Sequence, residues 1–417
     1  PVLFCKGDLM KYDFTSIIER QDAIAVEWPL AKNNRSPYYN YNIRVKEGFD
    51  FIPMWVADMN FPACPTIPQA IIERTQHTTY GYFAPRQEYF ESIIKWQKDH
   101  HGVEGLLPEH IGYENGVLGG VASALQVLCE QGGKVLVHSP VYVGFTGVLK
   151  NHGYEAVHTP LYKDEQGVWR MDYEDMDKKL KEQNIHVAIF CSPQNPTGRV
   201  WEKWEIEKAM EIYKANDCFV ISDEIWADLI LPGHKHIPTQ SISEDAKMRT
   251  VAMYAPSKTF NLAGLIGSYH IIYNKYLKDR IVKTESLSHY NSMNVLSMHA
   301  LIGAYKPEGY EWVAELCQVL GENVDYGYDY IKAHFAGVDI VKPQGTYLLY
   351  MDTTKWLEEH GKTYDQLYSR GLEYGVGWQN GEAFFMKNTI RMNLALPNSR
   401  VREAFDRLDK YVFNAEW

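Results

Sequence analysis

The middle of the chain alternates strand-like apolar runs with helix-like segments, and this alternation most constrains how the chain can fold. The strand-like runs are 134–138, 187–191, 218–222, 250–254 and 269–273. The segment 202–216 is typical of the intervening ones, because its apolar residues recur at helical spacing and it contains no Pro or Gly. The pattern predicts an α/β fold in which a mostly parallel sheet is sandwiched by helices.

The C-terminal part of the chain has a different pattern. Strand-like runs at 345–351 and 389–394 lie among helix-like segments, which favours a smaller α+β domain. Residues 10–14 resemble a native start, so the residues before them are treated as an extension outside the fold. The expected parts are a large domain at 58–302, a small domain with an N-terminal arm at 10–57 and 303–417, and the extension at 1–9.

The charge balance excludes some partners. The chain has a formal net charge of −11 at pH 7, whereas nonspecific nucleic-acid binding needs clustered Lys and Arg to displace counterions. No basic segment followed by an apolar stretch begins the sequence, and no run approaches the ~18 apolar residues of a membrane span. We therefore expect no nucleic-acid or membrane partner and a cytoplasmic location.

The cysteines and histidines give little sign of a metal. The six cysteines are scattered without a C-x-x-C pair, so they indicate neither a disulfide framework nor a thiolate zinc site. His234 and His236 flank one residue in a predicted loop, with no third ligand nearby in the sequence. We expect reduced cysteines and no metal.

Polar and aromatic residues follow four of the predicted strands. In open α/β sheets, ligands bind at the carboxyl ends of the strands, so we expect these residues to form one site. They are Tyr142 after 134–138, Asn195 after 187–191, Asp223 and Trp226 after 218–222, and Ser257 and Lys258 after 250–254.

These residue types suit a carbonyl cofactor with an electron-withdrawing ring. A reactive lysine such as Lys258 needs a carbonyl-containing cofactor, and Asp223 can pair with a protonated pyridine nitrogen. Asn195 can donate to a ring oxygen, and Tyr142 can stack on the ring face. The sequence therefore provides a candidate for each contact with such a ring.

A phosphate on the cofactor also has candidate ligands. Gly116, Val117 and Leu118 precede a long helix-like run, so their backbone amides can receive an anion at a helix N-terminus. The hydroxyl of Ser257 can add a further donor. A Gly-rich helix start also occurs where helices pack closely, and this alternative stays open.

Each of the other candidates also has an ordinary structural role. Lys258 taken alone is compatible with a solvated surface lysine, and Asp223 with a helix N-cap after a strand. Asn195 before Pro can shape a turn, and Tyr142 can serve packing. The residues alone leave these alternatives open.

Four short motifs follow one another along the chain: N-P-T-G at 195–198, S-D-E-I at 222–225, S-K-T-F-N-L-A-G-L at 257–265 and R-M-N-L at 391–394. A single motif is a weak signal, but four in this order are specific. In their order and spacing they resemble the class I and II aminotransferase superfamily of fold-type I pyridoxal 5'-phosphate (PLP) enzymes. The chain is most similar to the branch of cystathionine β-lyases and cystalysin-like C-S lyases, which W-V-A-D-M at 55–59 and Y-G-Y at 80–82 also fit.

The resemblance implies PLP as the cofactor and a role for each matching residue. Lys258 would hold PLP as a Schiff base and later move the α-proton, Asp223 would pair with the pyridine nitrogen, and Asn195 would bind the phenolate oxygen. The expected catalytic residues are Lys258, Tyr142 and Asp223. The expected cofactor-binding residues are these three with Asn195, Ser257, Val117, Leu118, Tyr82 and Trp226.

The resemblance also implies a substrate site and a homodimer. Arg391 and Asn195 would bind the substrate α-carboxylate, for which a planar guanidinium gives bidentate geometry, beside the backbone of Ala57. A structural ion pair is the alternative role for Arg391. Tyr82 would reach the cofactor phosphate of the neighbouring subunit, so the implied active unit is a homodimer.

Two positions depart from the aminotransferase pattern. Ile266 stands eight residues after Lys258, where aminotransferases usually carry an Arg on the phosphate; C-S lyases of this branch also lack that Arg. Trp226 stands where aminotransferases usually carry a Tyr and lyases often a His. An indole can donate one hydrogen bond but cannot act as an acid or base at neutral pH.

The resemblance implies a C-S β-lyase that cleaves cystathionine or a cysteine-type substrate by α,β-elimination to a thiol, pyruvate and ammonia. An aminotransferase is the first alternative, because it shares every step up to the carbanion. A non-catalytic regulatory protein on the same fold is the second, since some relatives of this branch are described as regulating transcription through protein contacts. A nicotinamide dehydrogenase is disfavoured, because Gly116-x-x-Gly119-Gly120 lacks the G-x-G-x-x-G order.

Overall fold

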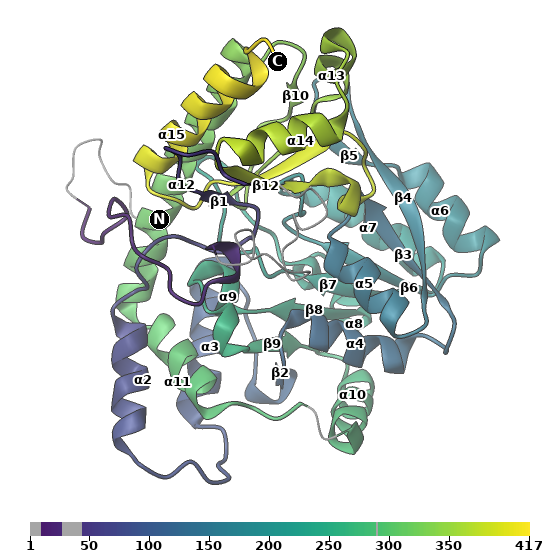
Figure 1. Ribbon diagram of the computed structural model, residues 1–417. Coiled ribbons are helices and arrows are strands. Elements are labelled where there is room, and N and C mark those ends of the chain that lie inside the picture. Colours follow the sequence, from purple (N-terminus) through teal and green to yellow (C-terminus); the bar gives the residue numbers. More distant parts are fainter. Residues whose placement is uncertain (1–9, 27–43, 289–290) are drawn as a thin grey trace. The chain divides into compact units, whose positions relative to one another are not determined.

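The computed structural model describes residues 10–26, 44–288 and 291–417 (Figure 1). The chain divides into two compact units. The larger unit comprises Ala63–Asn195 and Arg199–Ala314, and the smaller one Pro1–Pro62, Pro196–Gly198 and Glu315–Trp417. The extension expected at 1–9 lies outside the described residues, and the domain limits expected at 58 and 302 stay a prediction.

An eight-stranded sheet forms the centre of the larger unit, counted over the described residues. Its central strands β4, β3, β6, β7 and β8 pair in parallel, whereas β2, β9 and β5 join by antiparallel pairs. Across the sheet the strand order is β2 (Ile111–Glu114), β9 (Ser268–Ile271), β8 (Thr250–Tyr254), β7 (Phe219–Asp223), β6 (Val187–Cys191), β3 (Lys134–Ser139), β4 (Glu155–Lys163) and β5 (Trp169–Met171).

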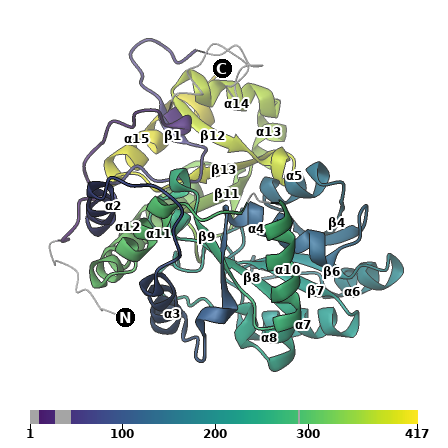
Figure 2. The same ribbon diagram turned by 90° about the horizontal axis from the view of Figure 1, so that it is seen from below.

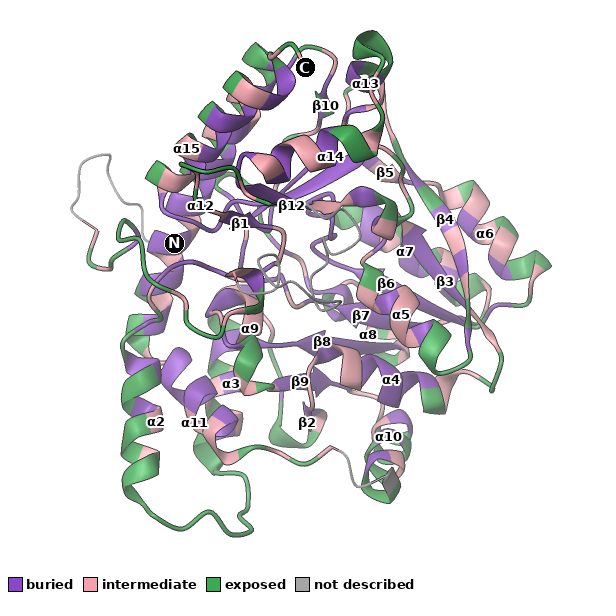
Figure 3. Ribbon diagram, in the orientation of Figure 1, coloured by how far each residue is buried: buried purple, intermediate pink, exposed green. Residues whose placement is uncertain are grey.

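The middle strands are buried on both faces, which explains their nearly continuous apolar sequences. Every residue of β6 and β8 is buried, as Figure 3 shows. The parallel register places Cys191 of β6 opposite Asp223 of β7, and Asp223 opposite Met253 of β8. The carboxyl ends of these strands therefore meet at one edge of the sheet.

Helices cover both faces of this sheet (Figures 1 and 2). On one face, Val121 of α4 (Val117–Leu128) and Ile281 of α10 (Lys275–Ser288) join one apolar core with Val137 of β3. On the other face, Tyr213 of α7 (Lys203–Ala215) contacts His138 of β3 through a 2.9 Å hydrogen bond. Val137 and His138 point to opposite faces because side chains alternate along a strand.

The remaining regular elements of the larger unit connect or flank these layers. Its other helices are α2 (Thr66–Gln76), α3 (Gln87–His101), α5 (Val143–Asn151), α6 (Tyr173–Glu182), α8 (Glu244–Arg249), α9 (Pro256–Thr259) and α11 (Val295–Ala304). Short helical turns occur at Pro108–His110, Thr239–Ser241 and Ala263–Leu265. The helix α12 (Pro307–His334) begins in the larger unit and continues into the smaller one.

The smaller unit contains a five-stranded sheet within the described part of the chain. Its strand order is β1 (Ile52–Met54), β12 (Val376–Asn380), β13 (Thr389–Asn393), β11 (Leu348–Asp352) and β10 (Asp339–Ile340). β1 pairs in parallel with β12, so the N-terminal part of the chain belongs to this sheet, and the other pairs are antiparallel. The remaining helical elements are α13 (Thr354–His360), α14 (Tyr364–Glu373), α15 (Asn398–Leu408) and the turns Gly381–Phe384 and Asp409–Phe413.

The predicted α/β organisation is confirmed, with all seven predicted strands present and only their limits shifted. The strand expected at 345–351 begins at Leu348, because Thr346 adopts a left-handed backbone with φ 67° that extended structure cannot include. Among the described residues, no helix combines the length and apolar character needed to cross a membrane.

Candidate functional site

Asp223 is a buried acid at the carboxyl end of β7. The residue is only 3 % exposed, and its Oδ1 accepts the backbone N–H of Ile225 at 3.0 Å. Burial raises the pKa of Asp223 from 3.8 to about 7, although the Ile225 amide and the charge of Lys258 act in the opposite direction. The carboxylate is therefore costly as it stands and is suited to a partner that donates a charged N–H.

Lys258 lies on the short helix α9, which follows β8 directly. Pro256 begins this helix, where its missing N–H costs nothing. The Lys258 ammonium nitrogen lies 5.6 Å from the centre of the Trp226 ring, and its charge acts on Asp223. The structure thus brings together three residues that sequence analysis assigned to one site from two different strand ends.

A second acid, Asp228, anchors α9. Its Oδ2 accepts the hydroxyl of Thr259, the residue after Lys258, at 2.7 Å. Its Oδ1 lies 2.9 Å from Nε2 of His101 and accepts the indole N–H of Trp96 at 3.0 Å. Burial acts to raise the pKa of Asp228, but the His101 contact outweighs it and the pKa lies below its usual range. Sequence analysis missed Asp228, because its partners on α3 and α9 are far from it along the chain.

Glu224 forms a neighbouring buried network. Its Oε2 lies 2.8 Å from Nε2 of His236 and accepts the Tyr254 hydroxyl at 2.6 Å. Burial opposes ionisation of Glu224, but the contacts with His236 and Tyr254 leave its pKa below normal, while burial lowers the pKa of His236. The lowered pKa of Glu224 and the lowered pKa of His236 both fit an ionised carboxylate beside a neutral imidazole, so His236 has a structural partner in Glu224.

Tyr142 lies beside the start of α4. A Cβ atom added to Gly144 would come within 2.4 Å of Cε1 of Tyr142 and 2.9 Å of Cδ1 of Leu118, so both side chains cover Gly144. α4 begins at Val117, after Gly116 with φ 75°. The first backbone N–H groups of a helix are not used within it, so this end can receive an anion next to the Tyr142 ring.

Asn195 follows β6 and Ser257 follows β8, so both lie at the carboxyl edge of the sheet. Asn195 is buried, with 3 % exposure, and follows Gln194, whose side chain donates to the carbonyl of Pro140 at 2.6 Å. This bond links the segment after β6 to the segment after β3, which carries Tyr142. Ser257 lies in α9 next to Lys258, and its carbonyl accepts the N–H of Leu262 at 3.0 Å.

A buried ionic cluster lies close to the start of α4. The ligand atoms of Glu114, His270 and Glu285 lie within 4.8 Å of one another, a geometry compatible with a metal ion. The ammonium of Lys278, however, lies 2.8 Å from Nε2 of His270, so a cation already faces the cluster. Burial raises the pKa of Glu114 and lowers that of Lys278 to about 8. Gly112 makes room here, because an added Cβ would lie 2.2 Å from His270. We interpret the cluster as an internal ionic network.

Arg391 and the segment around Ala57 come together in the smaller unit. Arg391 is 3 % exposed, and it donates to the carbonyl of Trp55 at 3.0 Å and to Oε1 of Gln379 at 3.2 Å. Its guanidinium also lies 4.7 Å from the ring centre of Phe384. Arg391 and the loop that carries Ala57 therefore share one hydrogen-bonded group, in which the guanidinium donates to a main-chain oxygen and to an amide oxygen.

Tyr82 belongs to a different surface of the larger unit. Its side chain is fully exposed, and it lines a pocket of about 720 Å³ with Tyr80, Phe83, Tyr113 and Lys278. A ring in full contact with solvent is available to another molecule. Its expected reach to the cofactor of a second subunit stays a prediction.

Comparisons with known proteins agree on one family. The family model described as aminotransferase class I and II matches residues 51–408. Cystathionine beta-lyase PatB of Bacillus subtilis is 32 % identical over 349 residues, which cover 83 % of this chain and 89 % of that protein. The PLP-bound structure of a putative aminotransferase from Clostridium difficile 630 has a TM-score of 0.86 and 32 % identity, covering 96 % and 99 % of the two chains. Cystalysin from Treponema denticola, whose structure contains PLP, has a TM-score of 0.85 and 29 % identity, covering 96 % and 98 %.

Proposed function

Because the chain belongs to the class I and II aminotransferase family, whose members depend on PLP, we propose that it is a PLP-dependent carbon-sulfur lyase acting on cystathionine or a cysteine-type amino acid. The reaction is an α,β-elimination that releases a thiol, and water then hydrolyses the remaining unsaturated amino acid to pyruvate and ammonia. The observation that carries the proposal is the buried Asp223 carboxylate, with a raised pKa, beside the amine of Lys258. The names of the lyase relatives support elimination as the outcome.

The described residues of the larger unit fit PLP by the chemistry of their donors. The Asp223 carboxylate would accept a hydrogen bond from the ring nitrogen, which compensates its burial. Lys258 would hold the cofactor covalently, and the N-terminus of α4 would bind the phosphate. Tyr142 would cover the ring, and Asn195 would donate to the ring oxygen. Bound PLP supplies an electron-withdrawing ring that stabilises negative charge on the substrate α-carbon.

The side chains of this chain then have distinct tasks. Asp223 keeps a proton at the ring nitrogen, because an ionised carboxylate in a buried site favours a positive neighbour. The substrate amine displaces Lys258 from its covalent bond, and the freed Lys258 Nζ takes the proton from the substrate α-carbon. Trp226 cannot exchange a proton at neutral pH, so proton transfer at this carbon is assigned to Lys258. Loss of the thiolate from the β-carbon completes the elimination.

Binding of the substrate carboxylate is assigned to Arg391, with Asn195 and the backbone of Ala57 as further ligands. Arg391 donates to the Trp55 carbonyl and to Oε1 of Gln379, and these two bonds orient its guanidinium beside the loop that carries Ala57. A planar guanidinium gives a carboxylate two parallel hydrogen bonds. The active unit is proposed to be a homodimer, in which the exposed Tyr82 ring reaches the cofactor of the partner.

An aminotransferase is the second candidate, favoured by the putative aminotransferase among the structural relatives. The two activities differ in their need for a keto-acid acceptor. The test is to incubate the purified PLP-loaded protein with L-cystathionine alone and to follow pyruvate with a lactate dehydrogenase assay and homocysteine with a thiol reagent. We expect both products without any acceptor, and none from Lys258→Ala. Strict dependence on an added keto acid would exclude the lyase, and a cellular function that survives Lys258→Ala would favour a regulatory protein.

A further inference from the structure

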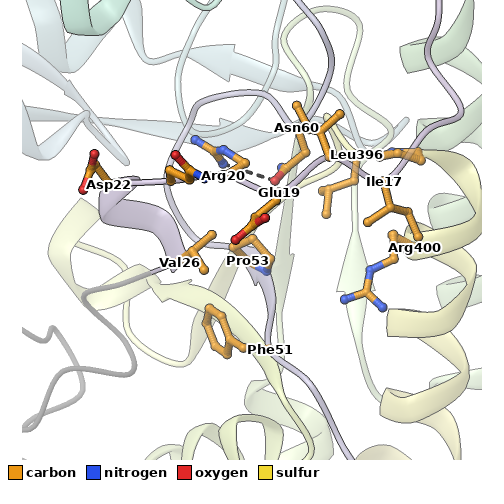
Figure 4. A pocket seen from close by; sticks show the side chains of 13 residues that line it. Ile17, Glu19, Arg20, Asp22, Val26, Phe51, Pro53, Asn60, Leu396 and Arg400 are labelled. Atoms are coloured by element: carbon orange, nitrogen blue, oxygen red, sulfur yellow. Dashed lines mark hydrogen bonds between the residues drawn. The ribbon is translucent and has the colours of Figure 1, made fainter.

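Arg20 contacts the loop that carries Ala57, and both lie in the smaller unit. Its guanidinium donates to the two carboxylate oxygens of Asp58 at 3.2 and 2.5 Å, and to Oδ1 of Asn60 at 3.1 Å. Figure 4 shows the Arg20 side chain directed at Asn60. The side chains of Arg20 and Asp58 are 13 % and 20 % exposed, so water screens this pair weakly. A bidentate, part-buried pair fixes orientation as well as charge.

Side chains of strand β13 form further hydrogen bonds with the same loop. Arg391 donates to the carbonyl of Trp55 at 3.0 Å. Asn393, two residues further along β13, donates to the carbonyls of Val56 and Asp58 at 2.7 and 2.6 Å. The loop 55–60 is therefore clamped between Arg20 and two side chains of one strand. A shift of this loop moves the Trp55 oxygen, which is one of the acceptors that orient the Arg391 guanidinium.

We infer that Arg20 is a positioning residue for recognition of the substrate carboxylate. Through Asp58 and Asn60 it holds the loop 55–60 where the Trp55 carbonyl aligns Arg391. The inference rests on the proposed role of Arg391 in binding the substrate α-carboxylate. Without Arg20, the Asp58 carboxylate loses a bidentate partner and turns towards water, and the loop loses one of its two clamps. The predicted effect falls on carboxylate binding rather than on the cofactor or the proton transfer.

Arg400 provides a matched control. It lines the same pocket of about 580 Å³ as Arg20, and its side chain is equally exposed, at 13 %. It pairs with Asp50 and Glu403 at 2.5 Å, and these partners lie outside the loop 55–60. Arg400 lies on helix α15 (Asn398–Leu408), and Figure 4 shows its side chain apart from that of Arg20. Arg400→Ala therefore removes a comparable arginine and its ion pairs without touching the loop.

The experiment compares binding of L-alanine and L-alaninamide to the PLP-loaded protein, followed by the change in the visible absorbance of the cofactor. L-Alanine has the α-carboxylate but no leaving group, and L-alaninamide lacks the carboxylate. The ratio of the two dissociation constants measures carboxylate recognition without turnover. The variants are Arg20→Ala, Arg20→Lys, Asp58→Asn, Arg391→Ala and Arg400→Ala, and KM and kcat for L-cystathionine are measured for each.

We expect Arg20→Ala to reduce the preference for L-alanine about tenfold, the effect of about 1.4 kcal/mol, and to raise KM while kcat changes less than about twofold. Asp58→Asn should reduce the preference to the same extent, Arg20→Lys less, and Arg400→Ala should keep it. If Arg20→Ala does not fold, Asp58→Asn and Arg20→Lys carry the test. Equal losses in Arg20→Ala and Arg400→Ala, or an unchanged preference in Arg20→Ala when Arg391→Ala loses it, would overturn the inference alone. An unchanged preference in Arg391→Ala would overturn the proposed carboxylate site together with it.

Discussion

Replacing Asp223 by asparagine should raise the stability of the protein without its cofactor and should lower its affinity for the cofactor. Burial raises the pKa of Asp223 from 3.8 to about 7, so the folded apo-protein holds a proton that the unfolded chain releases. An acid whose pKa is raised in the folded state is protonated at low pH and does not destabilise the fold there. The free energy of unfolding then falls as the pH rises from about 4 to about 7, where the folded protein must ionise the buried acid. An asparagine side chain cannot ionise, so the variant lacks this loss.

The size of the effect follows from the shift in pKa. Each unit corresponds to about 1.4 kcal/mol, so ionisation of Asp223 costs the folded apo-protein about 4 kcal/mol above pH 8. Below pH 4 both states are protonated and the cost disappears. Between pH 5 and pH 8 the free energy of unfolding of Asp223→Asn, relative to the wild type, should rise by roughly 2–3 kcal/mol.

The measurement is urea unfolding of both apo-proteins at several pH values, followed by tryptophan fluorescence. At each pH the free energy of unfolding of the wild type is subtracted from that of the variant. Only the change of this difference with pH is interpreted, because effects of the substitution that do not depend on pH then cancel. Asp279→Asn is the control, because the Asp279 side chain is 62 % exposed and its pairing with Lys275 is solvated. We expect the control difference to stay within about 0.5 kcal/mol of constant.

With PLP bound the ranking should invert. The ring nitrogen then partners the Asp223 carboxylate, whereas an asparagine amide offers no negative charge to it, so the variant should bind PLP more weakly and lose most of its lyase activity. A difference between the apo-proteins that stays flat from pH 5 to pH 8 would show that this carboxylate is not held in a buried, unfavourable setting. The assignment of Asp223 to the ring nitrogen would then have lost its physical basis.

Two further substitutions test the framework around the site. Asp228→Ala removes the acceptor of the Thr259 hydroxyl and the buried partner of His101, so it should lower the free energy of unfolding by about 3–5 kcal/mol, measured by urea unfolding. It should also slow pyruvate formation, because α9 is displaced. A loss of stability below about 1 kcal/mol would contradict the anchoring role. Gly198→Ala should cost about 1–3 kcal/mol in the same assay, because Gly198 has φ 69° and an added Cβ would lie 2.4 Å from Cβ of Pro343; unchanged stability would mean that this segment relaxes freely.

The sequence predicted the strand-end residues because their strands are buried on both faces. Continuous apolar runs such as β6 and β8 contrast sharply with the polar residues that follow them. The run at 218–222 was displaced by one residue: Asp223 is the last residue of β7, and it pairs in register with Cys191 and Met253. Its place at the sheet edge is unaffected, because the strand direction alone decides which end faces the site.

The strands missed by the sequence carry conflicting signals. β4 contains Pro160, and its burial alternates along the strand, so it lacks a continuous apolar run. β2 contains Gly112, which strand propensity disfavours. The structure explains that glycine: His270 on the neighbouring strand fills the space a side chain would need. Such a reason exists only once the two strands are paired.

Side-chain partnerships distant in sequence were equally out of reach. Asp228 meets Thr259 and His101 across 31 and 127 residues, and Arg20 meets Asp58 across 38. Nothing at either end of these pairs marks the other, because ordinary charged residues have many possible partners. The motifs predict which residues touch the cofactor, whereas the residues that pack against them and hold them in place become visible only in the structure.

Asp223 is where the demands of folding and of function separate most clearly. A strand end buried on both sides favours an apolar or neutral side chain, and an asparagine there would spare the apo-protein about 4 kcal/mol above pH 8. Local choices that oppose the fold are expected where a ligand needs them. The surrounding groups do not neutralise the acid: Lys258 lowers its pKa only in part, and the raised value remains. We therefore expect the ionised form of this carboxylate to be favourable only when a positive ring nitrogen lies against it, and the pH dependence of the apo-protein measures how unfavourable the buried charge is without that partner.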